Sequence, residues 1–476
     1  MSGDAVMRVR SHFDKVLRRG LADWGPEPTR MWMSSLDTAT GAYPEDDTRP
    51  ADIPRRHYRA IDAPRGCALY WDQPLIVAAH ALSGIVGDQR YARAADAYVG
   101  DFLGHCVARD GVFLWGNHYF WDVSRGCVVK FKGDEAPEPV DLDTESGDYH
   151  ETRPIPPAWD LFARVGAQAT ETEIRTFVAN SLFDPERGGF NRHADGKRGC
   201  AFLEAGGIIV ESLSWLYERT GDRDLVETAT RVASFSLAHR NEGTGLVENN
   251  PTVTRWDKHA STTEIGMFCG SLLRAHRRFG DDGELVARAS KGVERFIHYA
   301  MDEAPGGCYG KVAVADGSPV LGEATGVPHA AHRPGDCADP WRPLFPAHDY
   351  PFQLGECCVE LFRRTGGEAF RRGAEVLTEI VRRSLPARDG RGAYAEHYGR
   401  CIHLLSNCAA AFERPEFRAL AEDVAREAVA MLYAQDMFRS HPGEDRYDAV
   451  DGLGYLFVSL LELETGRAIG MMGSGW

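Results

Sequence analysis

The sequence predicts an all-α fold, specifically an α/α toroid of about seven helical hairpins with irregular loop insertions and short strands on one face. Three observations support this prediction. Short glycine turns recur after apolar segments of helical period, and a more charged amphipathic segment follows most of these turns. Long insertions rich in glycine, proline and aromatic residues separate some of the hairpins.

The glycine turns mark the hairpins. IVGD ends at Asp88, RTGD at Asp222, RFGD at Asp281, RTGG at Gly367 and ETG at Gly466, and each is typical of a helix that ends on a left-handed glycine. An N-terminal helix near residues 6–21 would pair with the last hairpin helix and close the ring. The first helices of the hairpins are expected to begin near Asp72, Ala158, Glu204, Thr263, Tyr350, Glu396 and Asp448.

The two helices of each hairpin differ in character. First helices such as GGIIVESLSWLY are apolar, whereas their followers, such as RDLVETATRVASFSLAHR, carry regular charge. This difference predicts an inner and an outer ring of helices. We therefore expect one toroidal catalytic domain over residues 1–476. The insertions at 111–157 and 306–347 would cover one face, where a toroid would place a site.

Composition excludes several classes of function. The net charge of −16 and the absence of a basic run argue against nucleic-acid binding. No stretch approaches 18 uninterrupted apolar residues, so we expect no membrane span. The N-terminus lacks the apolar segment of a secretory signal, and eleven cysteines without a CxxC pair favour free thiols, so we expect a cytoplasmic protein. The sequence does not indicate an oligomeric state.

Three short segments carry histidine beside carboxylate or arginine. WGNH contains His118, YHETRP contains His150 and Glu151, and FNRHADG contains Arg192 and His193. With these segments, residues from about Trp71 to Gly199 resemble polysaccharide lyase family 2, the metal-dependent pectate lyases built on an α/α seven-hairpin toroid. The interval between the first two segments is longer here, through an insertion around residues 127–148.

The resemblance implies that His118, Glu151 and His193 bind a divalent ion and that Arg192 is the catalytic base. The donor types agree, because two imidazoles and one carboxylate suit Mn, Co, Ni, Fe or Zn better than calcium; we expect Mn. We expect His150 to orient Glu151 rather than to bind the ion. If Arg192 stays charged, it would neutralise the substrate, and Tyr119 or His150 would be the base.

Other clusters are candidates for substrate binding. Trp115, Tyr119 and Trp121 would wall the site around His118. Further candidates come from TRWDKHAS and AYAEHYGR, whose cations and aromatic rings suit a carboxylated sugar. They are Arg255, Trp256, Lys258, His259, Tyr394, His397 and Tyr398. PAHDYPF adds His348, Asp349 and Tyr350 at the start of another inner helix.

Three functions remain open from the sequence. The first is a metal-dependent lyase that cleaves uronate-containing, pectate-like oligosaccharides by β-elimination. The second is a hydrolase of unsaturated uronyl sugars or a sugar epimerase, which would need acid and base groups instead of a metal. The third is a non-catalytic sugar-binding toroid. For the second, the candidate acid and base residues on inner helices are Asp72, Glu211, Glu264, Glu356 and Asp451.

Overall fold

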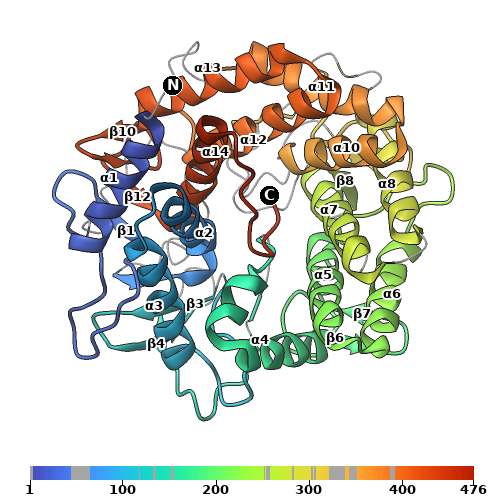
Figure 1. Ribbon diagram of the computed structural model, residues 1–476. Coiled ribbons are helices and arrows are strands. Elements are labelled where there is room, and N and C mark those ends of the chain that lie inside the picture. Colours follow the sequence, from blue (N-terminus) through green and yellow to red (C-terminus); the bar gives the residue numbers. More distant parts are fainter. Residues whose placement is uncertain are drawn as a thin grey trace.

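The chain folds into a ring of helices around a central axis (Figure 1). The described part contains thirteen α-helices, and the predicted all-α toroid is confirmed. The computed structural model describes residues 4–43, 65–116, 118–131, 136–148, 150–151, 155–250, 252, 258–280, 283–301, 304, 307–320, 338–341, 351–385 and 392–476.

The helices form two concentric layers, as the alternation of apolar and charged segments predicts. The inner layer contains α2 (Leu69–Val86), α5 (Leu203–Thr220), α7 (Thr262–Phe279), α10 (Phe352–Thr365), α12 (Ala395–Phe412) and α14 (Leu453–Thr465). The outer layer contains α3 (Arg90–His105), α6 (Arg223–Ala238), α8 (Glu284–Met301), α11 (Glu368–Arg383) and α13 (Pro415–Leu432). Helix α1 (Asp4–Arg19) packs on α14 and is its outer partner, so the predicted closure of the ring is confirmed.

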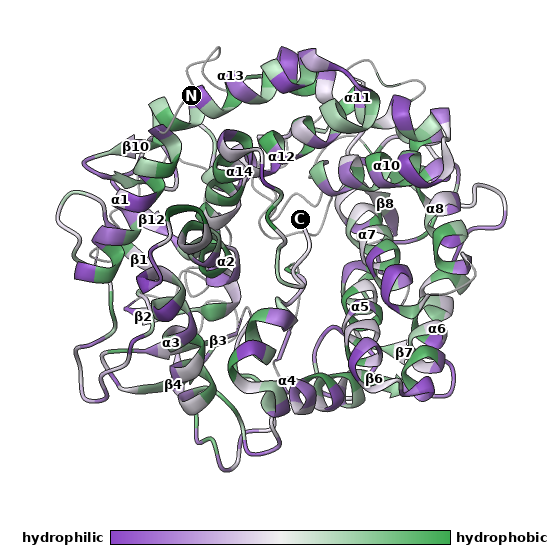
Figure 2. Cartoon of the chain, in the orientation of Figure 1, coloured by the Kyte–Doolittle hydropathy of each residue, from purple (hydrophilic) through white to green (hydrophobic). Residues whose placement is uncertain are grey.

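Hydropathy follows these layers. Figure 2 shows mostly hydrophobic ribbon on α2 and α14, while α3 and α11 alternate between hydrophobic and hydrophilic residues. Nearly every residue of α14 is buried, whereas α11 buries one face and exposes a row of arginine and glutamate side chains. An outer helix needs only one apolar stripe because its other side meets water.

One hairpin differs from the prediction. The segment expected to begin a hairpin near Ala158 forms one helix, α4 (Trp159–Ser181), with non-helical backbone angles at Gly166. A Cβ at Gly166 would lie 2.6 Å from Leu103 Cδ1 on α3. The helix therefore bends where a glycine permits close contact with the neighbouring helix α3. A single bent helix takes the place of the hairpin expected near Ala158 (Figure 1).

Glycines inside the inner helices set the spacing of the ring. A Cβ at Gly266 of α7 would lie 2.4 Å from the backbone nitrogen of Leu354 on α10. A Cβ at Gly454 of α14 would lie 2.0 Å from the nitrogen of Leu75 on α2. Neighbouring inner helices thus pack backbone to backbone. The glycines of all five predicted turns take the left-handed cap conformation: Gly87, Gly221, Gly280, Gly366 and Gly466.

Short strands occupy the insertions, as expected. The largest sheet has the order β2 (Gly66–Cys67), β3 (Tyr119–Asp122), β4 (Cys127–Lys130), β5 (Glu138–Pro139), with all pairs antiparallel. Two-stranded pairs are β1 (Ser35–Asp37) with β12 (Arg446–Asp448), β6 (Leu182–Asp184) with β7 (Gly189–Phe190), β8 (His259–Ser261) with β9 (Lys311–Ala313), and β10 (Tyr433–Ala434) with β11 (Met437–Phe438).

Two further features bear on the sequence predictions. Among the described residues, none of the helices combines the length and the apolar character needed to cross a bilayer. The ten cysteines in this part of the chain are free thiols, and eight of them are buried.

Candidate metal centre

Three loops bring His118, Glu151 and His193 together. His118 lies immediately before β3, Glu151 lies between β5 and α4, and His193 follows β7. Glu151 and His193 pair as an isolated antiparallel bridge, and the Ala194 nitrogen donates to the His150 carbonyl at 3.2 Å. Backbone pairing between the second and third loops therefore fixes two of the three side chains relative to each other.

The WGNH segment brings the third side chain to this pair through its glycine. Gly116 has a φ of +89°, and a Cβ there would lie 2.3 Å from the Glu151 carbonyl oxygen. Any side chain would push the two loops apart, so glycine is required for this close approach. Trp115 on one side of Gly116 is 1% exposed and anchors the loop in the core.

The side-chain atoms converge on the Glu151 carboxylate. Glu151 Oε2 is 3.3 Å from His118 Nε2 and 3.6 Å from His193 Nε2, and ligand atoms of the three residues all lie within 4.8 Å of one another. Two donor atoms bound to one ion by bonds of roughly 2.1 Å can be up to about 4 Å apart. The two distances from Glu151 fall inside this limit.

The hydrogen bonds place one ring nitrogen of each histidine beside the Glu151 carboxylate. His118 Nδ1 is 3.1 Å from the Phe131 carbonyl oxygen, which can only accept, so Nδ1 carries the hydrogen and a neutral ring has its lone pair on Nε2. His193 Nε2 accepts from Arg192 Nε at 3.3 Å. The His118 lone pair therefore faces the Glu151 carboxylate, and a backbone carbonyl holding the far nitrogen, as at His118, is a usual support for metal-binding histidine. The His193 lone pair accepts from Arg192, so a bound ion would have to replace this hydrogen bond. The residues present fit a divalent transition metal.

Burial and charge act in opposite directions on Glu151. Its side chain is 1% exposed, and burial alone would raise the carboxyl pKa. The charge of Arg192, 3.4 Å away, and the contacts with His118 and His193 outweigh burial and hold the pKa well below its ordinary value. The carboxylate is therefore ionised, while the histidine side chains remain 16% and 19% exposed and accessible from outside.

The prediction for His150 was wrong about its partner. The described contacts of the His150 ring are with Trp115, Phe177 and Glu173, and none is with Glu151. His150 Nε2 is 2.6 Å from Glu173 Oε1, and Glu173 Oε2 accepts from the Phe113 nitrogen. His150 is also 1% exposed, so it is not placed to act as a base. It holds the loop instead, because its carbonyl accepts from Ala194.

Glu173 is the residue that the sequence reasoning missed. It lies on the buried side of α4, four residues before Phe177, with the side chain fully buried. A lone carboxylate on the apolar side of an amphipathic helix needs a buried partner. That signal could have pointed to His150, the histidine next to Glu151.

The aromatic residues around His118 are packing residues, not walls of a sugar site. Trp115 and Trp121 are 1% and 3% exposed, and Trp115 contacts Phe102, Phe113 and Phe162. Tyr119 is 2% exposed, and its hydroxyl donates to Glu145 at 3.1 Å. The structure buries both side chains, so the predictions of Trp115 as a substrate contact and of Tyr119 as a catalytic residue stay predictions without support from the exposed surface.

The candidate binding residues elsewhere do not form an open surface. His259, Tyr394, His397 and Tyr398 are all less than 5% exposed. Tyr398 donates to Glu427 on the outer helix α13, so its hydroxyl is directed away from the central axis. Lys258 is partly exposed and forms an ion pair with Glu248. Arg255, Trp256, His348, Asp349 and Tyr350 lie outside the described residues.

The carboxylates considered for acid and base catalysis are mostly inaccessible. Asp72, Glu264 and Asp451 have no exposed surface. Burial raises the pKa of Asp72 to about 8, and its carboxylate accepts from Tyr98 at 2.7 Å. Glu211 is 2% exposed and forms a double hydrogen bond with Arg274. Only Glu356, with a side chain one-fifth exposed, lines an open cavity.

The fold and the cluster together define an α/α toroid with a mixed imidazole and carboxylate donor set in the loops on one face. Comparison with protein families gives a match over residues 70–201 to the family described as periplasmic pectate lyase. This match confirms the resemblance that the motifs indicated. The matched residues 70–201 agree closely with the range Trp71 to Gly199 expected from the sequence. The matched segment includes all three donors and Arg192, and it covers less than a third of the chain.

Solved structures with a similar course of the chain include sugar-acting enzymes. An inactive variant of an α-1,6-mannanase from a Salegentibacter species, in complex with α-1,6-mannotriose, has a TM-score of 0.48 at 9% identity over 97% of this chain and 99% of that chain. Cellobiose 2-epimerase from Bacillus thermoamylovorans has a TM-score of 0.49 at 9% identity, covering 96% and 98%. An unsaturated glucuronyl hydrolase specific for heparin has a TM-score of 0.42 at 12% identity, covering 65% and 83%.

Proposed function

We propose that the protein is a divalent-metal-dependent lyase that cleaves uronate-containing oligosaccharides by β-elimination. The convergence of His118, Glu151 and His193 supports this proposal most directly, because three donors from separate loops lie within 4.8 Å of one another. The match of residues 70–201 to a pectate lyase family supports the same reaction class. A pectate-like polyuronate is the substrate that this match favours.

The ion would be held by the two Nε2 atoms and by Glu151. When bound, it would supply a Lewis acid for the uronate carboxylate, which is worth several kcal/mol to a transition state that develops charge there. Two imidazoles and one carboxylate favour a transition metal such as Mn over calcium, which prefers oxygen ligands. Manganese is our specific proposal, with Co, Ni, Fe and Zn as the other candidates.

Arg192 is the group in this site best placed to act on the sugar. Its side chain is 23% exposed, and Nε contacts both Glu151 Oε1 and His193 Nε2. In the elimination, a base takes the C5 proton, the C–H electron pair forms the C4–C5 double bond, and the C4 oxygen leaves and gains a proton from solvent. We assign the base role to Arg192 on the resemblance to the pectate lyase family, since Tyr119 and His150 are buried and hydrogen-bonded elsewhere. In that role the guanidinium must first lose its proton, because the charged form beside Glu151 can only neutralise the substrate carboxylate.

A chelation experiment tests this function. Protein freed of metal would be mixed with polygalacturonate, alginate or heparin fragments, with and without added Mn²⁺, and the ultraviolet absorbance of the C4–C5 unsaturated product would be followed. We expect product only with the metal, no product after EDTA, and full activity in the control variant His298→Ala on the outer helix α8. Release of saturated sugars in EDTA would contradict a lyase and favour the hydrolase alternative.

A further inference from the structure

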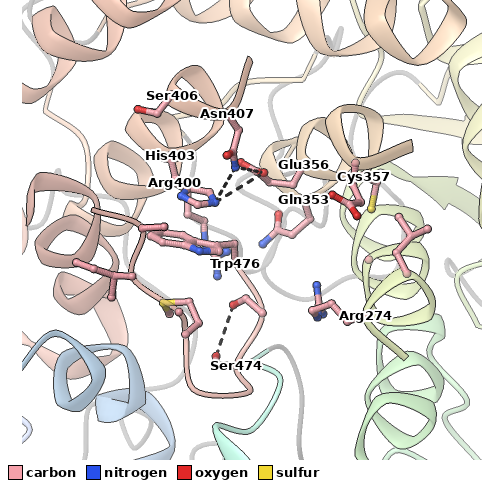
Figure 3. A pocket seen from close by; sticks show the side chains of 18 of the residues that line it. Arg274, Gln353, Glu356, Cys357, Arg400, His403, Ser406, Asn407, Ser474 and Trp476 are labelled. Carbon is pink, nitrogen blue, oxygen red and sulfur yellow. Dashed lines mark hydrogen bonds and ion pairs between the residues drawn. The ribbon is translucent and has the colours of Figure 1, made fainter. Parts of the chain in front are cut away.

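A cavity lies on the axis of the toroid, between the inner helices and the C-terminal segment. Its volume is about 580 Å³. Its walls come largely from α7, α10, α12 and α14, and the segment 466–476 crosses one side (Figures 1 and 3). None of the proposed metal ligands lines this cavity, although Pro156, from the segment between Glu151 and α4, does.

The cavity contains a buried amide without a partner. Gln353 on α10 is 4% exposed, and within the described structure neither its Oε1 nor its Nε2 has a hydrogen-bond partner. Figure 3 shows the Gln353 side chain directed into the cavity. Glu356, one turn further along α10, also has one buried oxygen, Oε1, without a partner. Buried polar atoms are rarely left unsatisfied, so these atoms call for a hydrogen-bonding occupant.

Two of the arginines at the cavity are paired with protein carboxylates. Arg274 forms hydrogen bonds of 2.7 and 2.9 Å with both oxygens of Glu211. Arg400 contacts Glu396 at 2.9 Å and lies over the Tyr455 ring at 3.9 Å. The charges on these two arginines are therefore balanced by protein carboxylates. The Gln353 amide and Glu356 Oε1 then offer a donor and acceptors, which suit the hydroxyl groups of a sugar.

An aromatic pair adds an apolar wall. The Trp476 and His403 rings stack at 3.5 Å with an interplanar angle of 12°. His403 Nε2 and Asn407 Nδ2 are 2.9 Å apart, and Asn407 Nδ2 donates to Glu356 Oε2 at 2.8 Å. A rigid aromatic surface beside a few placed polar groups is a common composition of small-molecule sites.

We propose that the central cavity binds a hydroxyl-rich sugar of about one or two rings, with the Gln353 amide both donating to and accepting from its hydroxyl groups. Glu356 Oε1 accepts a further hydroxyl, and Trp476 contributes apolar contact. The volume falls within the range of roughly 300 to 1,000 Å³ typical of ligand pockets. This site does not depend on the metal cluster or on the lyase reaction.

The test uses metal-free protein, so that the cluster cannot capture a uronate. Binding of D-galactose, D-galacturonate, D-mannose, cellobiose and inorganic phosphate would be measured by calorimetry and by ligand-detected NMR. We expect at least one of the sugars to bind saturably and phosphate not to bind. Preference for galacturonate over galactose would show that the carboxylate contributes, and equal binding would show that the hydroxyl groups suffice.

Gln353→Leu is the decisive variant, because it removes the amide at similar volume. We expect it to weaken sugar binding by at least about ten-fold, while its melting temperature stays equal or rises because an unsatisfied polar group is lost. Gln168→Leu on the exposed side of α4 is the matched control and should change nothing. Absence of saturable binding across the sugars, or unchanged binding in Gln353→Leu, would mean that the cavity holds only water and would overturn the proposal.

The two proposals can fail separately. Glu151→Gln should abolish metal binding and leave sugar binding in the metal-free cavity unchanged. Loss of sugar binding in a folded Glu151→Gln protein would place the sugar at the cluster and contradict the cavity site. Loss of lyase activity alone would bear only on the metal centre.

Discussion

Glu151 and Glu356 are both enclosed by the toroid, but their surroundings shift their pKa values in opposite directions. Arg192 and two histidines outweigh burial at Glu151 and lower its pKa. At Glu356, burial dominates over the charges of His403, Arg363 and Arg400 and raises the pKa. The first region therefore concentrates lone pairs around an ionised carboxylate, and the second offers polar groups with little net charge.

The difference follows from where each region lies in the fold. The candidate metal cluster is built by three loops, two of which pair through their backbones, so that side chains from distant parts of the sequence can face one another. The cavity is built by inner helices, where most charged side chains are already paired between neighbouring helices, as Arg274 is with Glu211. Loops thus create a strongly charged site, while packed helices create a neutral one.

The largest effect is expected from Glu151→Gln. The amide keeps the shape but removes the charge that the ligands surround, so we expect metal affinity to fall by at least about 100-fold and lyase activity to be lost with it. Metal binding would be measured by Mn²⁺ titration with electron paramagnetic resonance. If the variant keeps both tight Mn²⁺ binding and activity, Glu151 is not a ligand and the contrast between the two glutamates has no functional meaning.

An intermediate effect is expected from Glu173→Gln, which tests whether the cluster depends on support from α4. The change weakens the 2.6 Å contact with His150 Nε2, and His150 in turn holds Ala194 beside the ligand loop. We expect Mn²⁺ affinity to fall by about 10-fold with kcat less affected than metal affinity, and activity to recover at high Mn²⁺. Failure of added Mn²⁺ to restore activity would show a role other than positioning.

The smallest effect is expected from Glu356→Gln, and it concerns pH. Because the folded-state pKa of Glu356 lies above its ordinary value of 4.5, the folded protein retains this proton to a higher pH than the unfolded chain. The wild type should therefore lose stability as pH rises from about 4.5 through that raised pKa, and the glutamine variant should lose less. Melting temperatures at several pH values would differ by only about 2 °C.

The opposite trend would contradict the raised pKa of Glu356. If the wild type gained stability relative to the variant as pH rose through this range, the carboxylate would be stabilised in the folded state. The cavity would then be cationic, and an anionic ligand would suit it better than a neutral sugar.

Much of the architecture could be predicted because helical period and turn residues are local signals. The five glycine turns, the apolar first helices and the charged second helices each depend on neighbouring residues, and the structure confirms them. The exception is α4, where contact of Gly166 with Leu103 turned an expected hairpin into one bent helix. Gly166 lies on α4 and Leu103 lies on α3, so their contact cannot be predicted from neighbouring residues in the sequence.

The side-chain roles were harder to predict for the same reason. Trp115, Tyr119 and Tyr398 have the residue types of a sugar site, but strand and helix geometry turns them into the core. The three proposed ligands carried a stronger signal, because histidine, glutamate and the arginine-histidine pair occur in the order that the resemblance requires. His150 had the right neighbours in sequence but a different partner, Glu173, in space.

The sequence by itself determined the class of fold and the two layers of helices, and through the family resemblance it indicated the three candidate donor residues. These features depend on the order of residue types and on local conformational preferences, which can be seen directly in the sequence. Only the tertiary structure decided that Gly116 allows His118 to reach Glu151, that Glu173 supports His150, and that Gln353 faces an axial cavity without a partner. Each of these depends on contacts between distant segments, because distance and burial are set only when the ring closes.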